Sequence, residues 1–592
     1  MAQIGWIRIG RLAPWLASVA ALACAAPAAT RGGGEKEAEL PPEELDLVAP
    51  ESETDTGYLS TLATELEGEL VAELVLAADD EARRAIQDRW TRSRLVTEQI
   101  KFAKNQLHAE RLHLNLTAGD PSDVQVEELE GQIRIRYRMR TETIVTFAAL
   151  REAGIDDPAS LRDREYAFRV PADPRNLFER VGERCARGHE SGSLASFNYF
   201  SYFAPDAEGC DVPLVMGRFT VRSLLPAQAT YPEYDRLVQD GRIDVVAFYG
   251  AAEYGSEVDE WDWGMREWRD FERGLQQRGF RRSGVADETT GKGTRWTRTR
   301  GGLEQVVDVV SPRDLAALRD DRDGLFQRMV RTHEIVLYNG HSFYGSLRVL
   351  DDPQVYAPGL YQILFMNSCW SYEYYTKQVF RHKATDDDPT GWALADVVND
   401  TQAGWFHNME EFSRILLTNL LAGAESGGRE GNRRYHWQNI IDAMNRHALD
   451  AQRRWGTETH EIMGVSGVRT NRFDPDRTDP APGPTPEPER WERRATHVAS
   501  AHPYADDVDQ SFDVEAPAGA RQMRLVFSRI ETEARYDFVE VHDGSGRLVA
   551  RYDGTHQNVV TPPIEGSRAR IRLVTDYSIT AWGFELSAIE YR

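Results

Sequence analysis

Apolar residues in the middle of the chain form short continuous runs that alternate with longer amphipathic stretches. Residues 262–279 and 313–331 carry apolar side chains at helical spacing, which predicts helices. Short continuous runs are typical of strands that are buried on both faces of a parallel sheet. Such runs occur at residues 243–249, 306–310, 334–338, 361–366 and 396–400. This alternation predicts a mostly parallel sheet between two helical layers over residues 240–470.

The pattern changes on either side of this region. Residues 57–235 contain a long charged segment, 81–116, that predicts one helix, and a stretch at 132–140 that alternates like a half-exposed strand. We expect an α+β region of unassigned role there. The proline-rich residues 471–494 predict an extended linker, and the short alternating runs of residues 495–592 predict an all-β domain. The predicted fold class is therefore multidomain.

The first residues have the pattern of an export signal. Basic residues precede an apolar stretch, 12–23, that has the length of a signal-peptide core and is too short to span a bilayer. The segment that ends at Cys24 resembles a bacterial lipobox, which implies a signal over residues 1–24 and lipidation of Cys24; cleavage without lipidation is the alternative. Residues 25–56 predict a flexible acidic tether. We expect an exported protein, either a bacterial outer-membrane or cell-surface lipoprotein or a freely secreted protein.

Composition restricts the partners more than the fold. The chain has 592 residues, 41% of them hydrophobic, and a formal net charge of −25. That length predicts several domains with packed cores. A strongly acidic chain repels nucleic acid and anionic lipid surfaces. We therefore expect no nucleic-acid partner, and membrane association only through a lipid anchor.

The four cysteines have different predicted roles. Cys24 belongs to the signal segment. Cys185 and Cys210 lie 25 residues apart, and an oxidising compartment would let them form a disulfide. Cys369 then remains, either as a reactive thiol or as a buried cysteine that packs as a small hydrophobe.

A histidine and this cysteine each follow one of the predicted buried strands. His341 comes after residues 334–338, and Cys369 comes after residues 361–366. Functional side chains of open α/β sheets lie beyond the carboxyl ends of the strands, so the two residues could meet as base and nucleophile. A cysteine nucleophile needs such a base to form the thiolate near neutral pH. These residues predict a cysteine-histidine hydrolase.

The segments around the two residues resemble clan CD cysteine peptidases, such as caspases, legumain and gingipains. In that family one strand ends in a His-Gly motif, and the next strand ends at the catalytic cysteine. Here the corresponding segments end in Asn-Gly-His341 and Asn-Ser-Cys369. The resemblance covers residues 240–470. It implies a caspase-hemoglobinase-like fold, endopeptidase activity on a protein or peptide, and no cofactor for the catalytic step.

Backbone amides beside the histidine are candidates for binding the oxyanion of a tetrahedral intermediate. Gly340 and Gly345 flank the histidine and allow close approach of the backbone. Ser342 stands where the family has a glycine whose amide helps to form the oxyanion hole. The serine amide can point there as well. The departure keeps an alternative open, in which the protein is an inactive surface adhesion or scaffold lipoprotein that binds proteins or glycans.

Residues 495–592 resemble a CUB domain, a β-sandwich of extracellular proteins. Matching blocks follow one another at residues 502–504, 525–533, 536–544, 575–578 and 582–584. Many CUB domains bind calcium through carboxylates from separate parts of the chain, and the resemblance implies Glu533, Asp537 and Asp576 as ligands. The alternative is that the aspartates only bond the backbone of turns. Such a module would direct the peptidase to a protein or glycan.

Overall fold

The computed structural model describes residues 57–592 except residues 117–120, 190–192, 226–228, 254–257, 319–320, 346, 386–387, 389, 458–459, 477–491, 518, 534–535, 545, 547, 562–563 and 577. The predicted signal segment 1–24 with its lipidation site Cys24, and the predicted tether 25–56, lie outside the described residues. Of the predicted linker, residues 471–476 and 492–494 are described.

The chain divides after Pro475 into two units with separate cores. The first unit contains both the N-terminal region and the α/β region, and the second unit is Asp476–Arg592. The boundary falls within the predicted linker.

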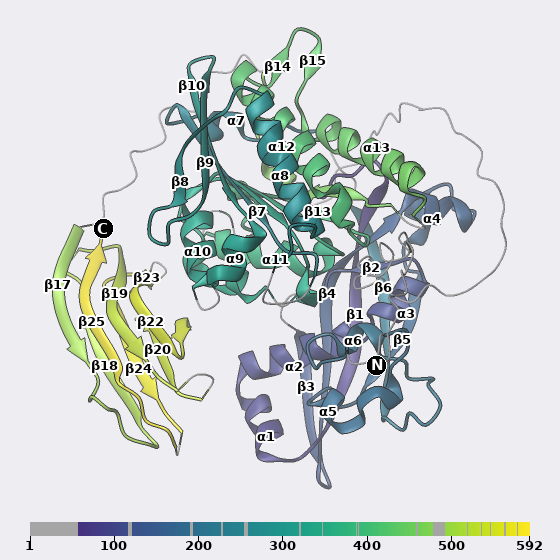
Figure 1. Ribbon diagram of the computed structural model, residues 1–592. Helices are drawn as coiled ribbons and strands as arrows, with labels where there is room; N and C mark the ends of the chain where they lie inside the picture. Colours follow the sequence, from purple (N-terminus) through teal and green to yellow (C-terminus); the bar gives the residue numbers. More distant parts are fainter. Residues whose placement is uncertain are drawn as a thin grey trace, which may run out of the picture. The chain divides into compact units, whose positions relative to one another are not determined.

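A mixed eight-stranded sheet supports the α/β region (Figure 1), in the order β16-β13-β12-β11-β7-β10-β9-β8. Its five central strands run parallel, as predicted: β7 (Arg242–Tyr249), β10 (Leu303–Val310), β11 (Ile335–Asn339), β12 (Gln362–Asn367) and β13 (Ala395–Asp400). Antiparallel strands form the edges: β16 (Met463–Ser466), β9 (Lys292–Arg300) and β8 (Arg281–Asp287). The strands that precede His341 and Cys369 are therefore direct neighbours.

Helices cover both faces of this sheet (Figure 1). One layer contains α8 (Trp263–Gln277), α12 (Met409–Ser426) and α13 (Trp437–Trp455), and the other contains α9 (Pro312–Leu318), α10 (Arg322–Thr332) and α11 (Ser371–Lys383). A small hairpin, β14 (Arg429–Glu430) and β15 (Arg433–Arg434), follows α12. Within β11, Ile335 and Leu337 join the core of the first layer, and Val336 and Tyr338 join that of the second. Because successive side chains of a strand point to opposite faces, this division gives the three layers predicted.

The N-terminal region forms a second, six-stranded sheet with antiparallel pairing. Its strands are β1 (Ala63–Ala77), β2 (His113–Leu114), β3 (Ser122–Leu129), β4 (Gln132–Thr146), β5 (Glu165–Pro171) and β6 (Leu214–Leu225). The shorter helices of this part of the chain are α4 (Phe147–Glu152), α5 (Leu177–Val181), α6 (Tyr199–Tyr202) and α7 (Tyr234–Leu237). The strand predicted at residues 132–140 is confirmed, since burial alternates there along β4.

The single helix predicted over residues 81–116 is wrong. The segment forms α1 (Asp80–Gln87), α2 (Arg89–Lys101) and α3 (Lys104–Ala109), and then enters β2. At Asp88 the backbone is extended, and the side chain accepts a hydrogen bond from the amide of Thr91 at 2.9 Å. An aspartate in this position ends one helix and caps the next. Beyond α3 the backbone of Arg111 is left-handed, with φ of 63°, which prevents further helix.

The N-terminal sheet and one face of the α/β sheet share a core. Leu70 of β1, Val336 of β11 and Tyr375 of α11 belong to the same cluster of buried apolar side chains. Polar bonds cross the same boundary, because the Tyr372 hydroxyl donates to a carboxylate oxygen of Glu65 at 2.5 Å. The two regions therefore differ in sheet topology but pack as one body.

The second unit is a sandwich of two antiparallel sheets. The five-stranded sheet contains β17 (Glu492–Ala499), β25 (Gly583–Tyr591), β19 (Gln522–Glu531), β22 (Thr555–Val560) and β23 (Ile564–Glu565). The four-stranded sheet contains β18 (Asp509–Glu515), β24 (Arg568–Val574), β20 (Phe538–Asp543) and β21 (Leu548–Tyr552). Side chains of both sheets, among them Phe527 and Val541, form one core. The predicted all-β domain is confirmed.

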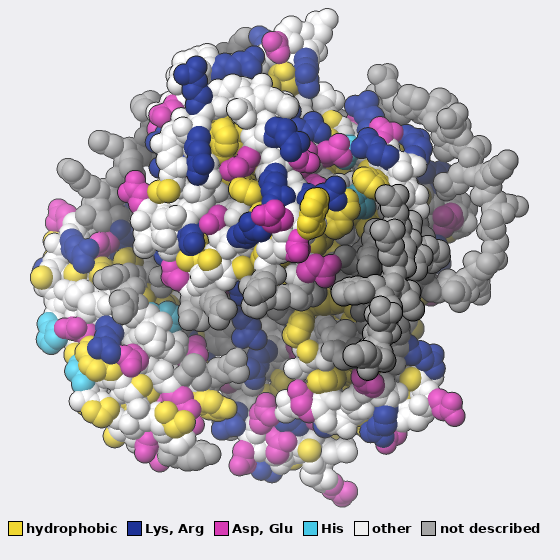
Figure 2. Space-filling view, in the orientation of Figure 1, with side chains coloured by type: hydrophobic (Ala, Val, Ile, Leu, Met, Phe, Trp, Pro, Cys, Tyr) yellow, Lys and Arg dark blue, Asp and Glu magenta, His cyan; other side chains and the backbone are white. Residues whose placement is uncertain are grey.

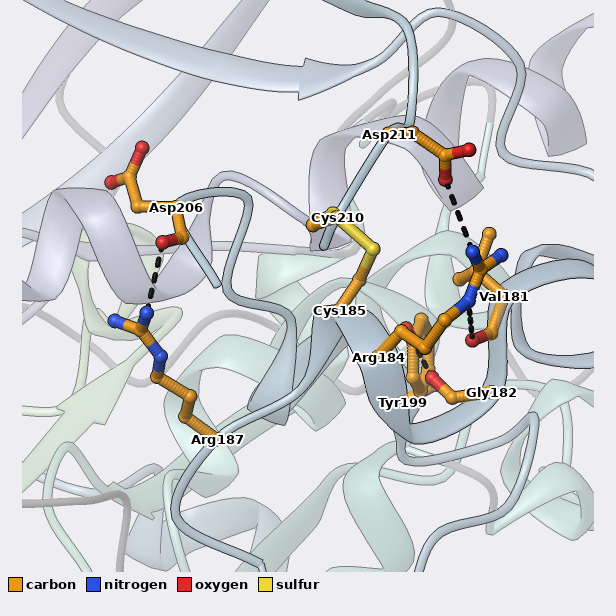
Figure 3. Close-up of a disulfide and its surroundings, with 9 residues drawn as sticks. All are labelled: Val181, Gly182, Arg184, Cys185, Arg187, Tyr199, Asp206, Cys210 and Asp211. Carbon is orange, nitrogen blue, oxygen red and sulfur yellow. Dashed lines mark hydrogen bonds and ion pairs between the residues drawn. A yellow bond between two sulfur atoms is a disulfide. The ribbon is translucent and has the colours of Figure 1, made fainter. Parts of the chain in front are cut away.

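The predicted disulfide between Cys185 and Cys210 is present in the N-terminal region (Figure 3). Its surroundings are bonded as well: Arg184 pairs with Asp211 at 3.6 Å, and Arg187 donates to the carbonyl oxygen of Asp206 at 2.8 Å. These contacts tie the ends of the intervening loop together independently of the sulfur atoms.

Loss of this disulfide should destabilise the first unit. Closing a loop of 25 residues contributes about 3 kcal/mol in the chain-entropy model. In thermal unfolding, the double variant Cys185→Ser/Cys210→Ser should melt below the wild type, whereas Cys369→Ser should leave this contribution intact. Peptide mapping of exported protein without reductant should recover the linked pair. Two free thiols at these positions would contradict the bond.

A buried carboxyl joins several elements of the α/β region. Oδ2 of Asp396, in β13, accepts hydrogen bonds from the Tyr361 hydroxyl at 2.6 Å, the Trp437 indole at 2.7 Å and the Asn471 amide at 2.8 Å. Burial disfavours the charged carboxylate more than these donors favour it, and the pKa of Asp396 is raised to about 7. The protonated form is therefore the stable one in mildly acidic solution.

This raised pKa should make stability fall as the pH rises. Between the ordinary value of 3.8 and about 7, folded Asp396 keeps a proton that the unfolded chain has lost. The stabilisation is present below this window and is lost as the pH rises through it. Asp396→Asn removes the titration and keeps an acceptor oxygen, so across the window the wild type should lose up to about 4 kcal/mol relative to the variant. Thermal midpoints measured at several pH values check this; parallel curves for the two proteins would contradict it.

Candidate active site

The structure places His341 and Cys369 at the same level of the sheet. β11 and β12 are parallel neighbours, and Asn339 pairs with Asn367 at their last residues. Each candidate residue lies two positions beyond its member of this pair. Both residues are buried, with 4% of His341 and 3% of Cys369 exposed. Adjacent strand ends therefore position the histidine and the cysteine.

Cys369 occupies a tight turn between β12 and α11. The next residue, Trp370, has a left-handed backbone with φ of 48°, and its amide donates to the carbonyl oxygen of Gln402 at 2.7 Å. A bulky residue in this conformation is strained, and such strain is typical of functional turns. α11 begins two residues after the cysteine, at Ser371. The positive end of the helix dipole favours a thiolate in this turn.

One loop contacts both candidate residues. Sγ of Cys369 donates to the carbonyl oxygen of Gly404 at 3.6 Å, and the ring of Phe406 lies 4.8 Å from that of His341, between centroids. Nε2 of His341 is 2.9 Å from the carbonyl oxygen of Ala252, which can only accept, so Nε2 carries the proton. The basic nitrogen of the neutral ring is then Nδ1.

The three amides predicted to bind the oxyanion differ in their bonding. The amide of Gly340 donates to the carbonyl oxygen of Asn367 at 3.2 Å, and the amide of Gly345 donates to that of Ser342 at 3.0 Å. These two donors are engaged within the protein. The Ser342 carbonyl also accepts from the Tyr375 hydroxyl, which holds the segment against α11. The oxyanion prediction therefore depends on the amide of Ser342.

A charged group from the N-terminal region lies beside this turn, and sequence reasoning missed it. Glu373 of α11 is fully buried, and its two carboxylate oxygens bond Lys104 Nζ and His108 Nε2. Nδ1 of His113 lies 3.5 Å from the second oxygen. We refer to Glu373, Lys104, His108 and His113 as the Glu373 cluster. It brings α3, β2 and α11 together.

Lys104 connects the Glu373 cluster to the turn that carries the cysteine. Its ammonium lies 4.4 Å from the ring centroid of Trp370. Burial lowers the pKa of Lys104, although the negative charge of Glu373 acts in the opposite direction. Burial also opposes ionisation of Glu373, but His108 and Lys104 outweigh it and hold the pKa of Glu373 well below its usual range. Burial lowers the pKa of His108 to about 4, so its neutral ring contributes a hydrogen bond near neutral pH.

A second candidate site lies in the C-terminal unit. Carboxylate oxygens of Glu533, Asp537 and Asp576 lie within 4.8 Å of one another and could hold a metal ion. The turn-bonding alternative holds for both aspartates, because Asp537 accepts from the amide of Asp576 at 2.8 Å and Asp576 accepts from the amide of Ser578 at 2.9 Å. Within the described part of the chain, however, the buried Oε2 of Glu533 has no hydrogen-bond partner. Burial and the charges of Asp576 and Asp537 raise the pKa of Glu533. Calcium, which prefers oxygen ligands, fits this set.

A cavity of about 380 Å³ lies elsewhere in the first unit, between α8, α12 and β9. Arg278, Arg298 and Glu425 are among its lining residues, and neither His341 nor Cys369 lines it. The cavity is therefore separate from the candidate active site.

On the face shown in Figure 2, basic and acidic side chains are interspersed over the surface.

Comparison with known proteins identifies the C-terminal unit. Residues 492–588 match the CUB domain family, so this unit is a CUB domain. The chain is also similar to the E3 ubiquitin-protein ligase HERC2 of Homo sapiens and of Mus musculus, at 33% identity over 93 residues. The match covers 15% of this chain and 2% of either relative. The chain therefore spans a very small part of these relatives.

Among solved structures, the chain is similar to the CUB1-EGF-CUB2 region of human MASP-1/3, with a TM-score of 0.15, 20% identity, and coverage of 16% of this chain and 41% of that one. It is also similar to the Ca²⁺-bound CUB2 domain of MASP-1, with a TM-score of 0.14, 20% identity, and coverage of 16% of this chain and 91% of that one. Dimeric latent PorU from Porphyromonas gingivalis shows a distant similarity, with a TM-score of 0.12, 12% identity, and coverage of 22% of this chain and 15% of that one. These TM-scores are too low to support a functional conclusion.

The disulfide and the CUB domain are both typical of extracellular proteins. In the part of the chain that the structure describes, no helix has the length and apolar character needed to cross a membrane.

Proposed function

We propose that the first unit is a cysteine endopeptidase in which His341 is the base and Cys369 the nucleophile. The observation that supports this most is their common loop: Gly404 contacts the sulfur, and Phe406, two residues later, contacts the imidazole. Adjacent parallel strands bring both residues to the same level beyond their carboxyl ends. Nucleophilic catalysis needs at least a nucleophile and a base, and here both contact the same loop.

The reaction would proceed through an acyl-enzyme. Nδ1 of His341 takes the thiol proton of Cys369, and the thiolate attacks the carbonyl carbon of a peptide bond. The resulting oxyanion accepts from the amide of Ser342. As the C–N bond breaks, the leaving amine takes the proton from His341, and a thioester remains on Cys369. Water then loses a proton to His341 and attacks the thioester carbonyl carbon. The C–S bond breaks, the new carboxylic acid is released, and the sulfur of Cys369 recovers its proton from His341.

The CUB domain would bind calcium through Glu533, Asp537 and Asp576, and would bind a protein or glycan that brings the peptidase to its substrate. A cation would balance three converging carboxylates and would supply a partner for the buried oxygen of Glu533. We further propose an exported protein, held at a bacterial surface by a lipid on Cys24 or freely secreted. The disulfide and the CUB domain support export.

A second candidate function is that of a non-catalytic surface protein that binds proteins or glycans. Burial of both proposed catalytic residues favours it, because only 4% of His341 and 3% of Cys369 are exposed. The engagement of the Gly340 and Gly345 amides within the backbone favours it as well.

Substitution of the proposed dyad separates the two functions. With unfolded protein as substrate, Cys369→Ala should abolish hydrolysis, and His341→Ala should lower kcat by at least about 100-fold, because it removes the general base. A small thiol-directed probe should label the wild type, label His341→Ala more slowly, and leave Cys369→Ala unlabelled.

The matched control for this experiment is His497→Ala, which changes an exposed histidine of the CUB domain. It should hydrolyse and label like the wild type. Hydrolysis that persists in Cys369→Ala would exclude this nucleophile. A folded wild type that neither hydrolyses nor reacts with the probe would favour the non-catalytic function.

Calcium should stabilise the isolated C-terminal unit. Free calcium at about 100 times its dissociation constant adds roughly 2.7 kcal/mol by linkage. The fragment 476–592 should therefore melt at a higher temperature with calcium than with chelator. Asp537→Ala should remove most of this difference, and magnesium should replace calcium poorly because it requires tighter octahedral geometry.

Asp513→Ala is the control for calcium binding, since this exposed carboxylate pairs with Arg570 outside the proposed site. It should keep the calcium-dependent shift. If millimolar calcium leaves the melting temperature of the wild-type fragment unchanged, the three carboxylates serve only as turn bonds.

A further inference from the structure

We propose that Lys104 of the N-terminal region supplies the positive charge that holds Cys369 as a thiolate, so that the N-terminal region completes the active site. The inference rests on the proposed role of Cys369 as the nucleophile. It gives residues 57–235 a function that the sequence leaves unassigned. Lys104 acts through Cys369 and is therefore a positioning residue.

Lys104 reaches the turn of the cysteine from α3. Its side chain is only 2% exposed, and its ammonium lies 4.4 Å from the ring centroid of Trp370 and 5.4 Å from that of Tyr374. The first ring belongs to the residue that directly follows Cys369, and the second lies in the first turns of α11. Water screens weakly in such surroundings, so the ammonium acts strongly on charges that develop in the adjacent turn.

The titratable groups nearest this ammonium lie on α3, β2, α11 and the turn of the cysteine, and the phenol of Tyr374 is one of them. The others are Glu373 of α11, His108 of α3, His113 of β2 and Cys369 of the turn. His108 is neutral near neutral pH, so Lys104 and Glu373 form a balanced pair. A thiolate at Cys369 would raise the pKa of Lys104, as the carboxylate of Glu373 does. By reciprocity, the ammonium favours the thiolate by the same free energy.

The Glu373 cluster also has the spacing of a metal site, but the ammonium takes the place of the metal cation. Ligand atoms of His108, His113 and Glu373 lie within 4.8 Å of one another, a spacing that zinc could bridge. Lys104 already donates to the carboxylate that such an ion needs. A second cation beside the buried ammonium would be repelled. The arrangement is therefore a buried ion pair with two imidazoles.

Glu373 has two parts in this arrangement. Its carboxylate keeps Lys104 charged, because a buried lysine without an anion loses its proton readily. Its backbone carbonyl accepts from the amide of Leu116 at 2.9 Å, which fixes the N-terminal region on α11. The same helix begins directly after the turn of Cys369. Packing of the N-terminal region on α11 therefore also places the ammonium beside this turn.

The test is the titration of Cys369 in the full-length protein, followed by the ultraviolet absorbance of the thiolate. For each protein, the absorbance of the same protein carrying Cys369→Ser is subtracted. The difference contains only the absorbance of Cys369, because tyrosines and other cysteines contribute equally to both. Lys104→Met should raise the titration midpoint by about one pH unit or more, since a neighbouring opposite charge shifts a pKa by that amount. Below the midpoint, the thiolate fraction should then fall about tenfold.

Two further variants separate charge from packing. Lys104→Met leaves the buried Glu373 without its cation, so the double variant Lys104→Met/Glu373→Gln serves if the single variant does not fold. Its midpoint should lie above that of the wild type and below that of Lys104→Met, because both the attraction and the repulsion are gone. Lys101→Met is the matched control: this lysine ends the preceding helix, is 30% exposed, and should leave the midpoint unchanged.

A wild-type midpoint in folded Lys104→Met, or in the folded double variant, would overturn the proposal. The absorbance requires no substrate, so the proposal and the peptidase function fail separately. A protein that titrates as expected but hydrolyses nothing refutes the peptidase alone. A protein that hydrolyses, and whose midpoint ignores Lys104, refutes the role of Lys104 alone.

Discussion

The first unit depends on one buried carboxylate, that of Glu373. This side chain is fully buried on α11, four residues after Cys369, and an unpaired charge at such a position would cost several kcal/mol. Its partners, Lys104, His108 and His113, all come from the N-terminal region. The N-terminal region therefore cannot separate from α11 without exposing or stranding this charge. The shared apolar core around the two sheets follows the same boundary.

The candidate active site is built from strand ends and one loop rather than from a helix face. Parallel pairing of β11 with β12 sets the level of His341 and Cys369, and the left-handed backbone of Trp370 turns the chain from strand to helix within three residues. The loop of Gly404 and Phe406 then closes over both side chains. A rigid sheet thus fixes the positions, and the connecting segments supply the chemistry, as is usual for α/β proteins.

Sequence reasoning reaches the part of this site that leaves a local signal. Continuous apolar runs predict β11 and β12, and residue order then predicts His341 and Cys369 at their ends. The carboxylates of the CUB domain follow from a resemblance whose blocks occur in order. The role of Lys104 is not predicted from the sequence, because the pattern of residues 81–116 predicts one solvated helix. In addition, 269 residues separate Lys104 from Glu373. Pairings between such distant residues leave no pattern in a single sequence; two histidines five positions apart are the sole local hint.

The energetics of the Glu373 cluster bear on why it exists. Replacing a buried ion pair by apolar side chains of similar volume often leaves stability unchanged or raises it. Apolar residues in place of Lys104 and Glu373 would therefore fill this space with equal or greater stability. A cysteine that served only as a small hydrophobe would gain nothing from a neighbouring ammonium, since its thiol is neutral. A thiolate would gain, because the ammonium offsets its desolvation. The buried cation next to the turn of Cys369 therefore supports the proposed thiolate more than a cysteine that only fills space.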